Sequence, residues 1–267
     1  MVLPGNNGEI CMVATAINPA RTSTGYFYVW MAAACVAVAF GGFAETYWLQ
    51  LATGTFVGGP LLHLHGALFS AWTLLLLSQT WLAAQSRLDH HRAWGLVGIS
   101  LATALLLVGM ATAISGMVAR IPVDGDVARR FLVVPTTSLG GFVVLFVAAI
   151  ANINRPDWHK RFMLVATISL LNAAVARVFF VMATGGGPGA RPGLTGPPPI
   201  PVTVGAGLIT DLLILAGAVY DWRSRGRVHP AYLVGAAVVV GLQLLRIPLS
   251  QSPMWLAFAD SLAKFAG

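Results

Sequence analysis

Seven apolar stretches of about 20 residues each place the strongest constraint on what this chain can fold into. A helix of about 20 residues crosses the roughly 30 Å hydrocarbon core of a bilayer, and it satisfies its own backbone hydrogen bonds there. The sequence therefore predicts an all-α, polytopic membrane protein with seven transmembrane helices. The expected spans are residues 26–44, 61–84, 94–118, 132–152, 160–183, 202–220 and 230–250.

The composition excludes a water-exposed globular domain. Only 9% of the 267 residues are charged and 57% are hydrophobic, whereas soluble domains carry about 25% charged residues. The net charge of +7 comes from Lys and Arg in short loops between apolar stretches. We therefore expect membrane lipid as the main partner and no nucleic-acid binding. Cys11 and Cys35 form neither a disulfide framework nor a metal-binding pair.

The loop charges also predict the orientation. Because Lys and Arg favour the cytoplasmic side, we expect a bacterial inner-membrane protein with a cytoplasmic N-terminus and a periplasmic or extracellular C-terminus. The expected parts are a tail over 1–23 without a cleavable signal peptide, the bundle over 24–252, and a short interfacial amphipathic helix over 253–267. The more basic side holds Arg21, Arg87, Arg92, Arg155, Lys160, Arg161, Arg223, Arg225 and Arg227, against Arg120, Arg129, Arg130, Arg191 and Lys264 on the other.

A short motif occurs three times, each time placing Arg four residues before His at the start of an odd-numbered span. The copies are Arg87–His91, Arg155–His159 and Arg225–His229. This repetition predicts three related helical hairpins behind an extra first helix.

The three motif histidines are candidate metal ligands. If the helix starts converge, His91, His159 and His229 would form a three-histidine site with an open position, as in catalytic zinc sites. Two of them would suffice for a bis-histidine haem. The alternative is that Arg and His merely mark the membrane interface. No HxxxH or HExxH motif favours the metal, so the cofactor stays open between a metal ion, a haem and none.

A second set of polar residues lies in the outer half of the spans. Arg177 and Asp211 are expected roughly 10–14 Å deep, where two opposite charges at matching depth predict an ion pair. Two buried arginines exceed what one carboxylate neutralises, which favours a small anionic or carbonyl-bearing ligand. The alternative is a structural network that tethers helices. The candidate ligand-binding residues are Glu45, His65, Trp72, Arg177, Asp211 and Arg246.

His63 and His65 are two residues apart, so on one helix they point about 200° apart and only one faces the bundle. His65 shares a stripe with Trp72 and Gln79 at a spacing of seven, which makes His65 the inward one. We expect Glu45 to reach the same depth and to hydrogen-bond either histidine. No residue in the chain is marked as a nucleophile, so the sequence does not decide whether the protein is an enzyme.

Several of these motifs together carry a resemblance. They are His63–Trp81, His91-Arg92, Trp158-His-Lys-Arg161 and Asp221…His229-Pro230. With them the chain resembles a group of bacterial multi-pass membrane proteins in which a "His-Gly…Trp…Gln" helix precedes "His-Arg" helix starts. That resemblance implies the membrane fold and no particular activity. Adiponectin-receptor-type hydrolases differ by an HxxxH on the last helix, and microbial rhodopsins by a lysine where this helix has Arg246.

Three functions follow as hypotheses. The first is a protein that binds or moves a small molecule through the outer-half polar pocket. The second is a membrane-embedded metalloenzyme or haem protein that uses the cytoplasmic-side histidines. The third is an accessory subunit of a membrane complex. The oligomeric state is not indicated by the sequence.

Overall fold

The computed structural model describes residues 19–190, 192, 193 and 195–266. Most of the predicted N-terminal tail, residues 1–18, lies outside the described residues, as do Arg191 and Cys11. Within them the chain is helical almost throughout, and the only β pairing is an isolated bridge between Pro192 and Thr195. The predicted all-α class is confirmed.

Eight helices form the body of the described part of the molecule, and four further segments join or cap them. The body consists of α1 (Pro19–Gly42), α3 (Pro60–Ala84), α4 (Leu88–Asp124), α6 (Val133–Ala151), α7 (Pro156–Leu170), α8 (Asn172–Thr184), α9 (Ile200–Arg225) and α10 (Pro230–Gln251). The joining and capping segments are the π-helix η1 (Ala44–Trp48), α2 (Leu49–Thr53), α5 (Asp126–Phe131) and α11 (Pro253–Ala266).

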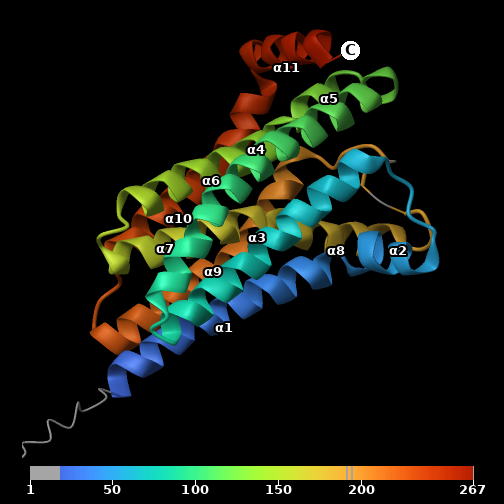
Figure 1. Cartoon of the computed structure of the whole chain (residues 1–267). Helices are drawn as coiled ribbons and strands as arrows, with labels where there is room; N and C mark the ends of the chain where they lie inside the picture. The colour runs from blue at the N-terminus through green and yellow to red at the C-terminus, as the bar shows by residue number, and fades with distance from the viewer. Residues whose placement is uncertain (1–18, 191, 194, 267) are drawn as a thin grey trace, which may run out of the picture.

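The number of membrane crossings agrees with the sequence. Among the described residues six segments are long and apolar enough to span a bilayer, with α5–α6 and α7–α8 each counted as one. A seventh is reached when α1 and its continuation into η1 and α2, which bends by 49°, are counted as one span. Helices α3 and α4, α6 and α7, and α9 and α10 pack against one another as neighbours. An odd number of crossings leaves the start of α1 and helix α11 at opposite ends of the bundle (Figure 1).

Local sequence sets where the helices begin and end. Proline occupies the first turn of α3, α7, α9 and α10, where its missing N–H costs no hydrogen bond. Gly54, Gly185 and Gly226 follow the last residues of α2, α8 and α9 in the left-handed conformation, which glycine adopts without strain. These signals explain why the observed bounds lie close to the predicted spans.

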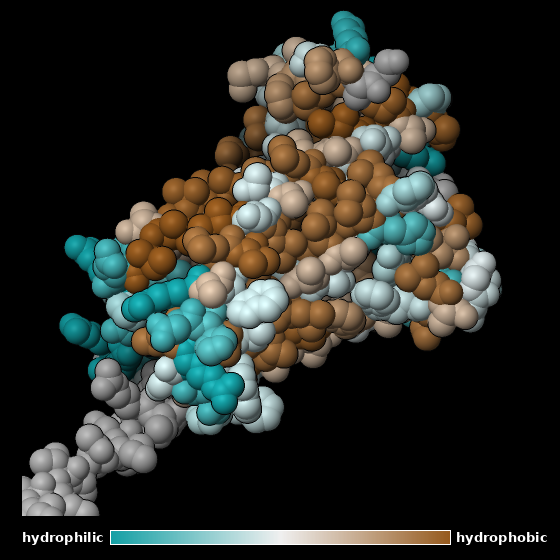
Figure 2. Space-filling view, viewed as in Figure 1, coloured by the Kyte–Doolittle hydropathy of each residue, from teal (hydrophilic) through white to brown (hydrophobic). Residues whose placement is uncertain are grey.

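The two ends of the bundle differ in charge. We call the end formed by the loops 85–87, 152–155 and 226–229 the basic end, and the opposite one the far end. Hydrophilic residues gather at the basic end while apolar residues cover the middle of the visible face (Figure 2). Trp81, Trp94 and Trp222 lie near helix termini of the basic end with half or more of their surface exposed. Exposed tryptophans at one level are typical of a membrane interface.

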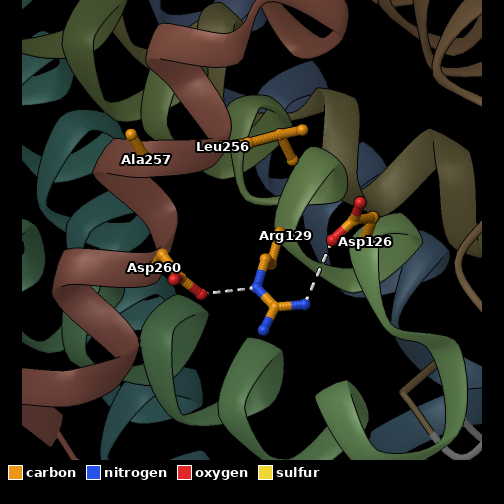
Figure 3. Close-up of a pocket in the computed structure, with 5 residues that line it drawn as sticks. All are labelled: Asp126, Arg129, Leu256, Ala257 and Asp260. Atoms are coloured by element: carbon orange, nitrogen blue, oxygen red, sulfur yellow. Dashed lines mark hydrogen bonds and ion pairs between the residues drawn. The ribbon is translucent and has the colours of Figure 1, made fainter.

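The predicted amphipathic C-terminal helix is present as α11, which docks on the far end. Trp255 is buried and donates from Nε1 to the Arg129 carbonyl oxygen at 3.1 Å. The Arg129 guanidinium bridges Asp260 at 2.9 Å and Asp126 at 3.2 Å (Figure 3). A surface hollow of about 310 Å³ lies between α5 and α11 at this place. Phe265 of α11 is exposed. The position of α11 in a membrane interface stays a prediction.

Candidate functional site

A cluster of polar side chains occupies the far half of the bundle. Asp211 lies on α9, Gln243 and Arg246 on α10, and Thr137 and Ser138 on α6. We call these five residues the Asp211 cluster. Arg246 is only 2% exposed, and its Nε and Nη2 atoms donate to Thr137 Oγ1 at 2.7 Å and Ser138 Oγ at 2.8 Å. By helix length, Arg246 lies about 8 Å and Asp211 about 16 Å from the far ends of their helices.

The Asp211 cluster is incompletely hydrogen-bonded. Both carboxylate oxygens of Asp211, Oε1 of Gln243 and Nη1 of Arg246 are buried, and among the described residues none has a hydrogen-bond partner. The Gln243 side chain lies close enough to Asp211 to interact with its carboxylate, and the Arg246 charge lies within electrostatic range of it, although no hydrogen bond of 3.5 Å or less joins them. Each unpaired buried polar atom costs about 1–3 kcal/mol, and more for a charged group. Such atoms in one cluster make it a candidate binding site.

A glycine makes room for this cluster. An added Cβ at Gly207 would lie 2.6 Å from Cδ of Gln243, which is shorter than real side chains allow. Gly207 is one helical turn before Asp211 on α9, so its missing side chain lets Gln243 lie against the α9 backbone beside Asp211. Small residues commonly permit such close helix approach in membranes.

A second polar group lies on helices α3 and α8. The Arg177 guanidinium carbon lies over the Phe43 ring at 4.5 Å from its centroid. The His65 ring packs on Phe69 at 4.3 Å between centroids, and the Arg177 charge lies within electrostatic range of it. His65 Nδ1 is buried and has no hydrogen-bond partner among the described residues. His65 is therefore inward-facing, and the charge that acts on it is the positive one of Arg177 rather than a carboxylate.

The predicted Arg177–Asp211 ion pair is wrong. Neither carboxylate oxygen of Asp211 has a hydrogen-bond partner among the described residues, and the positive charge within electrostatic range of Asp211 is Arg246. Helix α8, which carries Arg177, follows α7 after a one-residue interruption at Leu171. Helix α8 packs against α1 and α9, where Arg177 meets Phe43, while Asp211 faces α10. The six predicted residues thus do not form one site.

Glu45 and Trp72 are not placed as predicted either. Glu45 is exposed, and His63 Nδ1 is 3.2 Å from the Tyr47 hydroxyl rather than bonded to Glu45. Trp72 is 2% exposed and donates from Nε1 to Thr167 Oγ1 at 3.1 Å. Trp72 is consequently a core residue, and its indole N–H already donates a hydrogen bond to Thr167.

The structure brings together two of the three motif histidines. The rings of His91 and His159 lie 6.4 Å apart between centroids, nearly perpendicular. His229 instead caps α10, where its Nδ1 accepts from the Ala231 N–H at 3.2 Å, and its ring packs on Trp158. Within the described part of the chain no three His, Cys, Asp or Glu side chains are grouped to hold a metal ion. The expected three-histidine site is therefore not formed, because the third helix begins after its histidine rather than before it.

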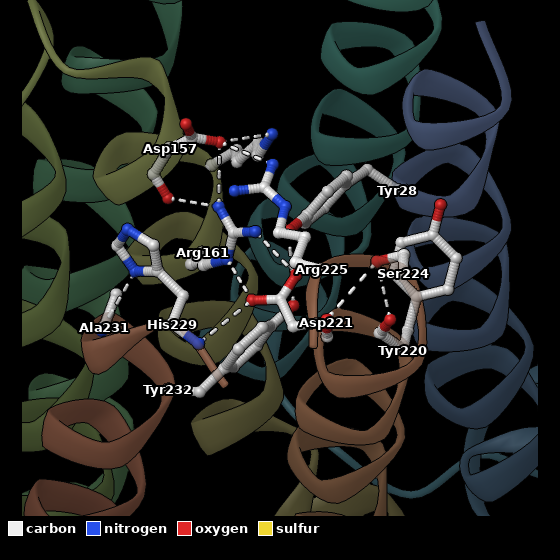
Figure 4. A network of polar contacts seen from close by, with 11 residues as sticks. Tyr28, Asp157, Arg161, Tyr220, Asp221, Ser224, Arg225, His229, Ala231 and Tyr232 are labelled. Carbon is white, nitrogen blue, oxygen red and sulfur yellow. Dashed lines mark hydrogen bonds and ion pairs between the residues drawn. The ribbon is translucent and has the colours of Figure 1, made fainter. Parts of the chain in front are cut away.

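A buried ion pair at the basic end was not predicted from the sequence. Arg161 on α7 binds Asp221 on α9 through two hydrogen bonds, Nε–Oδ2 at 2.7 Å and Nη2–Oδ1 at 2.6 Å, with both side chains buried (Figure 4). Its Nη1 donates to the backbone oxygen of Asp157 at 2.7 Å. The rings of Tyr28 and Tyr232 lie near the guanidinium, with centroids 5.9 and 5.7 Å from its carbon. This network fastens α1, α7, α9 and α10 together at the basic end.

A sequence signal for this network existed. Asp221 is the only acidic residue in the strongly basic segment 220–229, and Arg161 follows a helix start at which Lys160 already marks the interface. An acidic residue at the basic end requires a cation nearby. Arg161 adjoins Lys160 at a helix start and therefore resembles a charge at the membrane interface, but its side chain is fully buried.

The His229 cap predicts a pH dependence. Partial burial and the positive charge of Arg161 lower the pKa of His229, although Asp157 and Asp221 oppose the effect. The unfolded chain therefore takes up a proton at His229 first as the pH falls through about 6.5, and acidification destabilises the fold. We expect the thermal unfolding midpoint in detergent to fall between pH 7.5 and 5, and to fall less in His229→Asn, which keeps a capping oxygen. An equal fall in both proteins would contradict this assignment.

Fold and charge pattern together define the class: this is an all-α, multi-pass integral membrane protein. No protein-family model, curated protein or solved structure matches the chain. The function has to be argued from the chain's own residues.

Proposed function

We propose that this membrane protein binds or moves a small anionic or carbonyl-bearing molecule at the Asp211 cluster in the far half of the bundle. The observation that carries the proposal is the set of unpaired polar atoms around Arg246. Nη1 of Arg246 is a charged donor without an acceptor, and a carboxylate, phosphate or carbonyl oxygen supplies that acceptor.

The charges of the far half support this class of ligand. Within the Asp211 cluster, Arg246 carries the one positive charge and Asp211 the one carboxylate, and no hydrogen bond joins them. Intramembrane charges are expensive unless they are paired, and where they persist they usually mark a ligand or ion pathway. A bound oxygen acceptor at Nη1 offsets part of this cost, because charge-assisted hydrogen bonds contribute about 1.5–3 kcal/mol.

The surroundings limit how the ligand enters. The two surface hollows described, of about 310 and 210 Å³, are lined by residues of α5, α11, the 198–201 segment and Gln251, and neither reaches the Asp211 cluster. Because Arg246 is only 2% exposed, the molecule enters when α9 and α10 separate. Movement of helices around a site near the membrane midplane is the usual mode of membrane transporters.

Binding is tested on the purified protein in detergent with inorganic phosphate, acetate and a 2-oxo acid such as pyruvate as probes. We expect at least one probe to raise the thermal unfolding midpoint in a saturable way. Arg246→Gln should weaken that binding by about 10- to 100-fold, since it removes a charge-assisted contact. Arg92→Gln is the matched control, because the Arg92 side chain is 76% exposed at the other end.

Two outcomes would count against the proposal. One is that none of the three probes shifts the midpoint of the wild-type protein. The other is that the shift survives in Arg246→Gln. If Arg246→Gln does not fold, Asp211→Asn provides the second variant: it removes the competing negative charge, and we expect it to strengthen the binding of an anionic probe.

A further inference from the structure

Helices α4 and α7 begin in the same way, and each presents a histidine at the same position. Arg87 and Arg155 precede the two helices, and His91 and His159 are the fourth residues within them. The backbone N–H of each histidine donates to the carbonyl oxygen of its arginine at 3.0 Å. The sequence repeat is thus a structural one for these two copies.

Both imidazole rings are held by the preceding helix. Nδ1 of His91 lies 3.3 Å from the Gln79 carbonyl oxygen, and Nδ1 of His159 lies 2.9 Å from that of Ala149. A carbonyl oxygen only accepts, so Nδ1 carries the hydrogen on each neutral ring and Nε2 keeps its lone pair. A backbone carbonyl that fixes one ring nitrogen while the other binds a metal is the usual support of a metal-ligating histidine.

The two rings also lie at a suitable separation. Their centroids are 6.4 Å apart at an interplanar angle of 86°. Two imidazoles that bind one ion through N–metal bonds of about 2 Å have ring centroids about 5 Å apart at a tetrahedral angle and about 6.5 Å apart on opposite sides of the ion. The observed spacing fits ligands on opposite sides, as in tetragonal Cu²⁺, and a tetrahedral ion requires the rings to approach by about 1 Å. Both side chains are partly buried, and Asp89 pairs with Arg92 at 3.8 Å, which reduces the positive charge beside His91.

We propose that His91 and His159 bind one divalent first-row transition metal ion, Zn²⁺ or Cu²⁺, between the starts of α4 and α7. Neutral imidazole nitrogens favour these ions over Mg²⁺ or Ca²⁺, which prefer oxygen. In the described part of the chain no third His, Cys, Asp or Glu side chain joins the pair. Water completes the coordination, so the ion keeps exchangeable positions. This site is independent of the Asp211 cluster.

The test uses full-length protein purified without a histidine tag, incubated with Zn²⁺ and desalted before elemental analysis. We expect about one ion per chain in the wild type and at least a tenfold loss of affinity in His91→Gln and in His159→Gln. Matched controls are His90→Gln, next to His91 but exposed, and His229→Gln, which lies against Trp158. Both controls should retain the ion.

A second measurement does not depend on the variants folding. With Cu²⁺ bound to the wild-type protein, electron paramagnetic resonance should show hyperfine splitting from two nitrogen ligands. The proposal is overturned if the wild type retains no more Zn²⁺ than the double variant His91→Gln/His159→Gln, if the His90→Gln control loses the ion equally, or if the Cu²⁺ spectrum shows fewer than two nitrogens. A Soret band in the purified protein would likewise overturn it, because the two histidines would then bind haem iron.

Discussion

Replacing Arg161 by methionine is expected to lower the free energy of unfolding by about 3–5 kcal/mol, the largest effect of any single substitution considered for this chain. Arg161 and Asp221 are 0% and 1% exposed, and two hydrogen bonds of 2.7 and 2.6 Å join them. Methionine fills much of the volume of the arginine stem but leaves the Asp221 carboxylate buried without its cation. Equilibrium unfolding in mixed detergent micelles measures the loss.

Two further variants separate the buried charge from the general cost of mutation. Arg225→Met removes a partly exposed guanidinium that pairs with Asp157 at 3.0 Å, and such pairs contribute about 0–1 kcal/mol. The double variant Arg161→Met/Asp221→Leu removes both buried charges, and we expect it to recover most of the loss. A double variant as unstable as Arg161→Met would show that packing against Tyr28 and Tyr232, and not the uncompensated charge, causes the effect.

The sequence predicted the fold well because the bilayer leaves few choices. Segments of about 20 apolar residues have to be helices, and their ends carried proline and glycine signals that fix the bounds to a few residues. The break at Leu171 within the fifth span was not predicted, since residues 160–183 read as one apolar stretch without proline or glycine. The bend after α1 was missed for a different reason, because the sequence gives no signal for the π-helix η1.

The candidate site was harder to predict because depth along a helix does not give the facing direction. Arg177 and Asp211 were predicted at similar depth, yet Arg177 lies over Phe43, the residue between α1 and η1. Asp211 and Arg246 were both predicted from the sequence as buried charges. Their neighbours on α6, Thr137 and Ser138, are uncharged and were therefore not predicted. The histidine motif predicted that the helix starts converge. This is so for His91 and His159, but His229 precedes its helix and does not join them.

Gly42→Ala is the second substitution with a large expected effect, and it acts where α1 crosses α8. A Cβ at position 42 would lie 2.5 Å from the backbone oxygen of Ala174 and 2.7 Å from its Cβ. A backbone oxygen cannot rotate aside as a long side chain does, so the two helices have to separate. Overpacking of this kind costs about 1–3 kcal/mol, and we expect a corresponding fall in the free energy of unfolding.

Gly41→Ala is the matched control, because nothing lies within 4 Å of a Cβ there. Alanine is the better helix former by about 0.5–1 kcal/mol, so this variant should be unchanged or slightly more stable. The two neighbouring substitutions are thus expected to act in opposite directions, and a similar loss from both would contradict the close crossing. Separation of α1 from α8 also moves Phe43 away from Arg177, which follows Ala174 by less than one turn. If the Arg177–His65 group contributes to the bound state, Gly42→Ala weakens probe binding as well as folding, while Gly41→Ala leaves both intact.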